Sequence, residues 1–166
     1  MKLTKIETPP RTRIDTTVGT RVFVGDTMFY GDTGRRMLTG WDSTGAVTYG
    51  TLPSGIVPTP GVSGGIYIRR IGHRVTMYLI AANAGSSSPS IPIPDGFRVT
   101  SAPFPFTNLF PIRAGGVTHA RIGATSAFLG GVTAGANMAD ATNSYAASIS
   151  WDATQSWPTT LPGTPA

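Results

Sequence analysis

Residues 65–81 read GIYIRRIGHRVTMYLIA and decide the fold of this 166-residue chain. Apolar and polar residues alternate on both sides of Gly72-His73, which is the pattern of two antiparallel strands joined by a two-residue turn. Glycine at the first turn position favours a type II′ turn, because that position needs a positive φ. We therefore predict a β-hairpin from Ile66 to Ala81.

The turn also sets the register of this hairpin. The expected pairs are Ile71 with Arg74, Ile68 with Met77, and Ile66 with Leu79. Residues two apart in a strand share a face, so one face is apolar and forms the predicted core: Ile66, Ile68, Val75, Met77 and Leu79. The opposite face is amphipathic and carries Tyr67, Arg69, Thr76 and Tyr78. A slip of one residue would exchange the two faces, so the register is strongly specified.

The rest of the chain alternates short β-type runs with turn signals. Further strands are expected at residues 21–24, 27–30, 35–38, 46–52, 97–100, 117–125, 126–132 and 144–151. The last of these alternates cleanly and places on one face Tyr145, Ala147, Ile149 and Trp151. A polar turn is expected at 42–45, and a Pro-rich extended tail at 152–166. The Pro/Gly/Ser-rich connection at 53–65 marks a possible internal boundary.

The composition also favours many short strands. The chain contains 21 Gly, 14 Pro and 24 Thr, and its hydrophobic fraction of 40% is sufficient for a packed core. We expect an all-β fold, an antiparallel β-sandwich or jelly-roll-like domain, over residues 21–166. Residues 1–20 show no clear period and contain Pro9-Pro10, so they are expected to form an extended attachment arm.

Charge and cysteine content exclude several partners. The formal net charge is +5, but the 13 Lys and Arg are scattered and form no basic stripe, so we expect no nucleic-acid partner. The absence of cysteine rules out disulfides and thiolate metal sites. Residues 1–20 lack the apolar core of a signal peptide, and the longest apolar stretch, residues 75–82, is too short to span a bilayer. We expect synthesis in the cytoplasm and no membrane insertion.

Charged residues are sparse in the C-terminal part of the chain. Beyond Val99 they are Arg113, Arg121, Asp140 and Asp152. A monomer surface normally carries far more charge. Either the solvent face is unusually rich in Thr and Ser, or much of this part is buried against identical chains. We favour the second interpretation, which predicts a homo-oligomer.

The sequence shows no combination of residues suited to catalysis. His73 lies in the predicted turn, and His119 lies in a predicted strand without an acidic residue close to it in the sequence. Most acidic residues are aspartates beside Gly, Ser or Thr, where a carboxylate typically caps a turn. Asp26 and Asp32 fit that role better than the role of a paired acid and base. We therefore expect no enzyme activity, no metal and no cofactor.

Aromatic residues are the best candidates for ligand binding, because rings stack on the apolar faces of sugars. The candidates are Trp41, Tyr67, Tyr78 and Trp157. Trp41 precedes the polar turn at 42–45, so we expect it to be free of core packing and Trp41→Ala to change the melting temperature little. Trp157 is expected to anchor the tail on a neighbouring surface. Trp151, at the end of an alternating strand, is expected in the core.

Four short motifs occur in order along the chain. They are VGDTMFYGDTG at 24–34, GIYIRRIGHRVTMY at 65–78, IPDGFR at 93–98 and WPTTLPG at 157–163. This series resembles the C-terminal β-domain of minor tail proteins and tail fibres of phages infecting actinobacteria. Arg35 departs from the family, which has Trp after the GDTG. The resemblance implies a homotrimeric virion part that contacts the host envelope, and it supplies no catalytic residues.

We therefore interpret the chain as a phage virion structural protein of the tail-fibre or minor-tail, receptor-binding type. It is expected to be a homotrimer, to dock on other virion proteins through residues 1–20, and to contact host cell-wall polysaccharide. One alternative is a capsid head fibre or decoration protein, with the arm on the shell. Another is a cell-wall-degrading enzyme, against which the missing acid pair and metal ligands argue.

Overall fold

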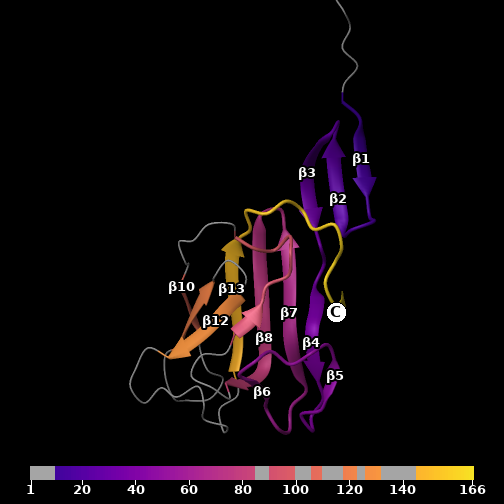
Figure 1. The fold of residues 1–166 in the computed structure, drawn as a ribbon. Coiled ribbons are helices and arrows are strands. Elements are labelled where there is room, and N and C mark those ends of the chain that lie inside the picture. The colour runs from indigo at the N-terminus through magenta and orange to yellow at the C-terminus, as the bar shows by residue number, and fades with distance from the viewer. Residues whose placement is uncertain (1–9, 85–89, 100–105, 110–117, 123–125, 132–144) are drawn as a thin grey trace, which may run out of the picture.

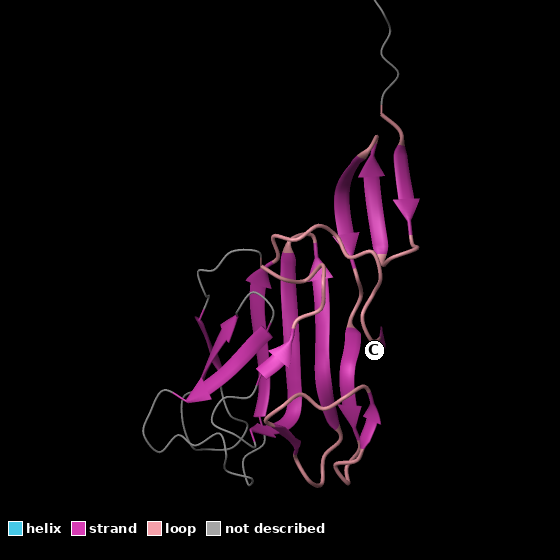
Figure 2. Cartoon of the chain, in the orientation of Figure 1, coloured by secondary structure: helices cyan, strands magenta, loops and turns pink. Residues whose placement is uncertain are grey.

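The computed structural model describes residues 10–84, 90–99, 106–109, 118–122, 126–131 and 145–166 (Figures 1 and 2). In these ranges the regular secondary structure consists of β-strands alone. The strands pair antiparallel in a ten-stranded and a four-stranded sheet. The predicted all-β antiparallel class is confirmed, and the two sheets are consistent with a β-sandwich. None of these ranges contains a helix long and apolar enough to cross a membrane.

The predicted hairpin is formed by β7 (Gly64–Ile71) and β8 (Arg74–Ala84), and its register is the expected one. Gly72 has a φ of +55° and His73 has a negative φ, as a type II′ turn requires. The inner face is buried as predicted, because Ile66, Ile68 and Val75 are 0% exposed. Period-two alternation was therefore a sufficient guide here.

Two strands flank this hairpin: β4 (Arg36–Trp41) pairs with β7, and β13 (Tyr145–Asp152) pairs with β8. We call β4, β7, β8 and β13 the body sheet. Ile149 and Trp151 of β13 are both 1% exposed, which confirms these two residues of the predicted core face, whereas the side chains of Tyr145 and Ala147 lie outside the described part of the structure. The core lies between the body sheet and residues 90–99, which contribute the buried side chains Ile91, Ile93 and Phe97.

The second sheet has the order β10-β11-β12-β9 and lies beside β13 (Figure 1). Its strands are β9 (Ser90–Pro92), β10 (Phe106–Leu109), β11 (Thr118–Ile122), which contains His119, and β12 (Ser126–Gly131). The predicted strand at 97–100 is wrong, because Phe97 closes a turn by donating its N–H to the Pro94 carbonyl at 3.2 Å. Much of the charge-poor part beyond Val99 lies outside the described residues, so a self-interface there stays a prediction.

Short strands complete the body. They are β5 (Val47–Tyr49) and β14 (Thr164–Pro165), both paired with β4, and β6 (Ile56–Pro58), paired with the end of β8. The predicted polar turn is present, and the Asp42 carboxylate accepts the N–H of Thr44 at 2.8 Å. Ile56 is 3% exposed and belongs to the common core. The connection at 53–65 therefore does not separate two domains.

Residues 12–32 form a three-stranded ribbon that projects beyond the end of the body sheet (Figure 1). Its strands are β1 (Thr12–Asp15), β2 (Thr20–Val24) and β3 (Thr27–Asp32), in the order β1-β2-β3. β3 joins the body through the pair Asp32 and Ile71. The expected arm boundary at residue 20 thus divides the ribbon, while residues 1–9 of that arm lie outside the described part.

Candidate functional site

The side chain of Arg70 lies where the four sequence motifs meet. Arg70 points to the inner face of β7 and is 2% exposed. Its guanidinium donates to backbone carbonyl oxygens of Gly72 at 2.8 Å, Ser156 at 2.9 Å, Gln155 at 3.0 Å, and Gly96. Burial lowers the pKa of Arg70, although arginine keeps its proton in proteins. Carbonyl dipoles from three separate segments therefore solvate this buried cation.

Residues 31–34, with the sequence GDTG, form the joint between the ribbon and β7. Thr33 is buried, donates its N–H to the Arg70 carbonyl at 3.0 Å and accepts the Arg70 N–H on its hydroxyl at 2.8 Å. Asp32 accepts two hydrogen bonds from the Arg69 guanidinium, at 3.0 and 2.5 Å. These bonds are the main reason that the pKa of Asp32 lies below its usual value. The predicted turn aspartate is thus also half of an ion pair between ribbon and body.

Residues 152–166 form a strap that passes the end of the body sheet and returns to β4 (Figure 1). Trp157 donates from Nε1 to the Val18 carbonyl at 3.0 Å. Its ring lies so close to Gly31 that a Cβ there would be 2.6 Å from ring atoms. The Arg70 guanidinium lies 5.2 Å from the centroid of the same ring. Trp157 therefore anchors the strap, as predicted, and the neighbouring surface that it contacts is the ribbon of its own chain.

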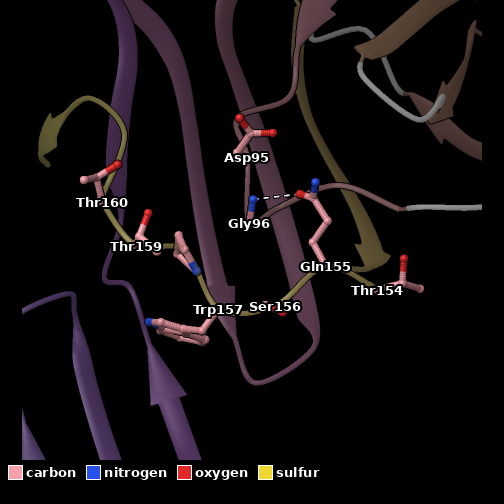
Figure 3. Close-up of a pocket in the computed structure, with 9 residues that line it drawn as sticks. Asp95, Gly96, Thr154, Gln155, Ser156, Trp157, Thr159 and Thr160 are labelled. Carbon is pink, nitrogen blue, oxygen red and sulfur yellow. Dashed lines mark hydrogen bonds between the residues drawn. The ribbon is translucent and has the colours of Figure 1, made fainter.

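A pocket of about 470 Å³ opens where the strap meets the turn that follows β9 (Figure 3). It is lined by Asp95, Gly96, Thr154, Gln155, Ser156, Trp157, Pro158, Thr159 and Thr160. The side-chain oxygen of Gln155 accepts the N–H of Gly96 at 2.7 Å and of Arg98 at 3.2 Å. The Asp95 carboxylate binds the Arg98 guanidinium at 2.5 Å. These two side chains of the pocket wall therefore stabilise the turn and hold the strap against it.

The outer face of the body sheet brings together two of the predicted ligand-binding residues. Tyr67 and Tyr78 lie directly opposite each other on β7 and β8, and both are half-buried. The guanidinium carbon of Arg35 lies 4.0 Å from the Tyr67 ring centroid and 5.4 Å from that of Tyr78. Ser148 of β13 continues the row beyond Tyr78. This face combines aromatic rings, a cation and hydroxyl groups.

Trp41 lies in the core, so the expectation that it is free of packing was wrong. It is the last residue of β4, is 2% exposed, and donates from Nε1 to the Ala81 carbonyl at 3.2 Å. Its partner across the sheet is Gly64, where a Cβ would come within 2.6 Å of Nε1. The polar turn begins only one residue later, which is why the local sequence was misleading. Burial leaves no ring face of Trp41 open to a ligand.

Arg70 and Arg35 were not among the predicted site residues. A signal for Arg70 was present in the sequence, because the period that buries Ile66 and Ile68 also places residue 70 on the core face. A charge at such a position needs buried polar partners. Arg35 was noted in the sequence only as a departure from the resembled family. The strand predicted at 35–38 begins at Arg36, so Arg35 lies in the connection between β3 and β4.

Comparisons with protein-family models, with curated proteins and with solved structures give no match. In the described ranges, no group of three or more His, Asp or Glu side chains is placed to hold a metal ion. The functional argument therefore rests on the contacts and exposed surfaces of this chain itself.

Proposed function

We propose that this chain is a structural protein of a phage virion, of the tail-fibre or minor-tail type, that assembles as a homotrimer and contacts host-surface glycan. The observation that carries the proposal is the convergence of the four motifs. Residues 31–34, 70–72, 96–98 and 155–157 are far apart in sequence, yet hydrogen bonds and ring contacts join them around Arg70. Motifs that pack together belong to one structural unit. Because the four motifs occur in the same order as in the phage tail proteins that the chain resembles, their packing supports a similar architecture and not only a similarity of short motifs.

The ribbon supports the assembly part of the proposal, because its two faces differ. The cross-strand pairs show which residues share a face. The face that we call the strap face carries Arg13, Asp15, Arg21, Phe23, Met28 and Gly31. Its own side chains cover it: the Arg13 guanidinium lies 4.4 Å from the Phe23 ring centroid, and Arg21 binds Asp15 at 2.6 Å. The strap residue Trp157 packs on the same face.

The opposite face of the ribbon, which we call the open face, is uncovered by the described residues. Its central row across the three strands is apolar and consists of Ile14, Val22 and Tyr30, while Thr12, Val24 and Thr27 form the row on one side of it and Thr20 and Asp32 the row on the other. Phe29 lies in the bulge of β3 and belongs to no cross-strand pair. Ile14 is 67% exposed and Phe29 is 80% exposed. A small sheet needs to bury an apolar face to be stable. A surface of this kind on a soluble chain typically marks an interface.

A second copy of this chain is the partner that best fits the open face. Along the ribbon strands, the pairing places no Lys or Arg on this face, and its carboxylate, Asp32, is already bound by Arg69. Two copies can therefore meet here without bringing like charges together, whereas the net charge of +5 opposes contact elsewhere. β1 also ends the sheet order, so its outer edge is available for pairing with a neighbour.

Light scattering of the purified chain tests this assembly. We expect a trimer at micromolar concentration, and a monomer for the double variant Ile14→Ser with Phe29→Ser, because it removes the two most exposed large apolar side chains of the ribbon. Val62→Ser is the matched control, since Val62 is 49% exposed but lies on the body. A monomeric wild type would contradict the proposal. Loss of the trimer on deletion of residues 1–9, but not in the ribbon variant, would assign the interface to the arm.

Labelling of intact phage particles tests the virion part of the proposal. Antibody-bound copies are expected at the tail tip in electron micrographs. Label on the shell would identify the chain as a head fibre or decoration protein instead. Particles that carry no copy would exclude a virion role.

A further inference from the structure

Most arginines of the described part bind an aspartate or backbone carbonyls, and Arg35 does neither. Those that form ion pairs with aspartates are Arg13, Arg21, Arg69, Arg74 and Arg98. Arg36 and Arg70 donate to backbone carbonyls. Among the arginines whose side chains the structure describes, this leaves the guanidinium groups of Arg11 and Arg35 without a hydrogen-bond or ion-pair partner. Of these two, Arg35 is the one held against aromatic rings.

The position of Arg35 is fixed although the residue is exposed. Its backbone carbonyl accepts the N–H of Ala166 at 3.1 Å, and the N–H of the preceding Gly34 is bound by the Asp32 carboxylate at 2.8 Å. Tyr67 and Tyr78 hold its guanidinium through cation–π contacts. Stacking uses the face of the guanidinium and leaves its in-plane N–H groups available to an oxyanion. Little side-chain entropy is therefore left to lose when a ligand binds.

The surface around this cation is suited to a saccharide. The next row of the outer face carries Arg69, Thr76 and Ser150, and the hydroxyls of Thr76 and Ser150 are 3.0 Å apart. Asp32 neutralises Arg69, so Arg35 supplies the unbalanced positive charge of this described patch. Aromatic rings bind the apolar faces of sugars, and a planar guanidinium binds carboxylate or phosphate through two hydrogen bonds.

We propose that Arg35, Tyr67 and Tyr78 bind a saccharide that carries a carboxylate or phosphate group. The oxyanion lies on the guanidinium of Arg35, and the sugar ring lies beside that guanidinium, against the exposed parts of the half-buried tyrosines that Arg35 leaves uncovered. The hydroxyl pair of Thr76 and Ser150 is placed to contact the next sugar along the sheet. This inference rests on the proposed function for the class of partner, a host-surface glycan, and adds the charge of that glycan.

Binding of defined oligomers to the full chain, measured by surface plasmon resonance, tests the proposal. The probes are an oligogalacturonate, an oligomer of glycerol phosphate, a neutral maltooligosaccharide and a single-stranded DNA of similar length. We expect one or both anionic non-nucleic oligomers to bind better than the neutral one, and Arg35→Gln to weaken that binding about tenfold. Arg74→Gln removes the same charge from an exposed, weakly paired site and is expected to change binding within about twofold. Loss of binding to the oligogalacturonate would identify a carboxylate as the group that Arg35 binds, and loss of binding to the glycerol phosphate oligomer would identify a phosphate.

Several results would overturn this inference. They are an equal loss with Arg74→Gln, binding of the neutral oligomer that matches the anionic ones, and DNA binding with the same dependence on Arg35. Binding to intact host cell walls, measured in parallel, separates the two proposals. Cell-wall binding that is unaffected by Arg35→Gln would overturn the anionic site and leave the proposed adhesion in place. Absence of any cell-wall binding by the wild type would contradict the adhesion itself.

Discussion

The body hairpin and the ribbon are built from the same pattern and have opposite surroundings. Both are antiparallel, and in both the register of the strands brings apolar side chains together on one face. In the hairpin the apolar face is closed, since Ile66 and Ile68 are 0% exposed, whereas Ile14 on the open face of the ribbon is 67% exposed. Alternation therefore specifies that a strand has an apolar face, and the neighbouring elements decide whether that face is core or interface.

The ribbon is nevertheless attached to the body by several contacts. Asp32 binds Arg69 of β7, Thr33 exchanges hydrogen bonds with Arg70, and Trp157 of the strap bonds to Val18. These contacts use the strap face and the base of the ribbon. The open face is thus presented at a defined angle to the body sheet, which is what a repeated interface between copies needs.

The largest expected effect contrasts an aromatic residue of the body with one of the ribbon. Trp41→Ala should lower the free energy of unfolding by about 3–5 kcal/mol, because it leaves a cavity in the core and removes the bond to Ala81. Phe29→Ala should change it by less than about 0.5 kcal/mol at concentrations at which the chain is monomeric. Urea denaturation measures both. Similar losses for the two variants would show that the ribbon is packed as tightly as the body.

The next largest effect concerns the cation at the joint. Arg70→Met should cost about 3 kcal/mol, because the carbonyls of Gly72, Gly96, Gln155 and Ser156, which are buried or partly buried, lose their donor. Arg74→Met is the control, because its contact with Asp152 is 3.5 Å long and exposed. It should cost about 0.5 kcal/mol or less. Thermal and urea unfolding of the two variants distinguish a structural joint from a general charge effect.

A smaller effect is expected for the link between strap and ribbon. Trp157→Phe keeps a ring beside Gly31 but removes the donor to Val18, so it should cost about 1 kcal/mol. Hydrogen exchange should then become faster in β1 and β2 and stay unchanged in β7 and β8. Faster exchange throughout the body would mean that the ribbon and the body open as one unit.

The smallest effect is a pH dependence of the joint. Hydrogen bonds from Arg69 lower the pKa of Asp32 in the folded chain. A lowered folded pKa stabilises the fold above the unfolded value of about 3.9, and this contribution is lost as the pH falls through the folded pKa. The difference in urea midpoint between wild type and Asp32→Asn should therefore shrink below about pH 4. A constant difference would mean that the ion pair contributes no pH-dependent stability.

Local sequence patterns were enough to predict the central hairpin, the buried side chains of β13 and the turn at Asp42. The register of β7 and β8 follows from a turn at Gly72 and a period of two, and Ile149 and Trp151 follow from the same period in β13. The Asp42 turn is also local, because the carboxylate binds N–H groups only two to four residues away. For the hairpin and the Asp42 turn the partners are close along the chain, so the sequence states both the element and its contacts. For β13 the period predicted only the buried face, because its partner β8 is distant in the sequence.

Only the tertiary structure decided the burial of Trp41, the carbonyl shell of Arg70, the return of the strap and the exposure of the open face. These features depend on contacts between distant segments, such as Trp157 with Val18, which are 139 positions apart. Alternation states which side chains share a face, but not which segment covers that face. Trp41 and Ile14 are the two examples: the tryptophan beside a polar turn is in the core, and the isoleucine of the expected arm lies in a strand whose face is left uncovered by the described residues. The physical reason is that burial is a property of two surfaces, and a strand encodes only one of them.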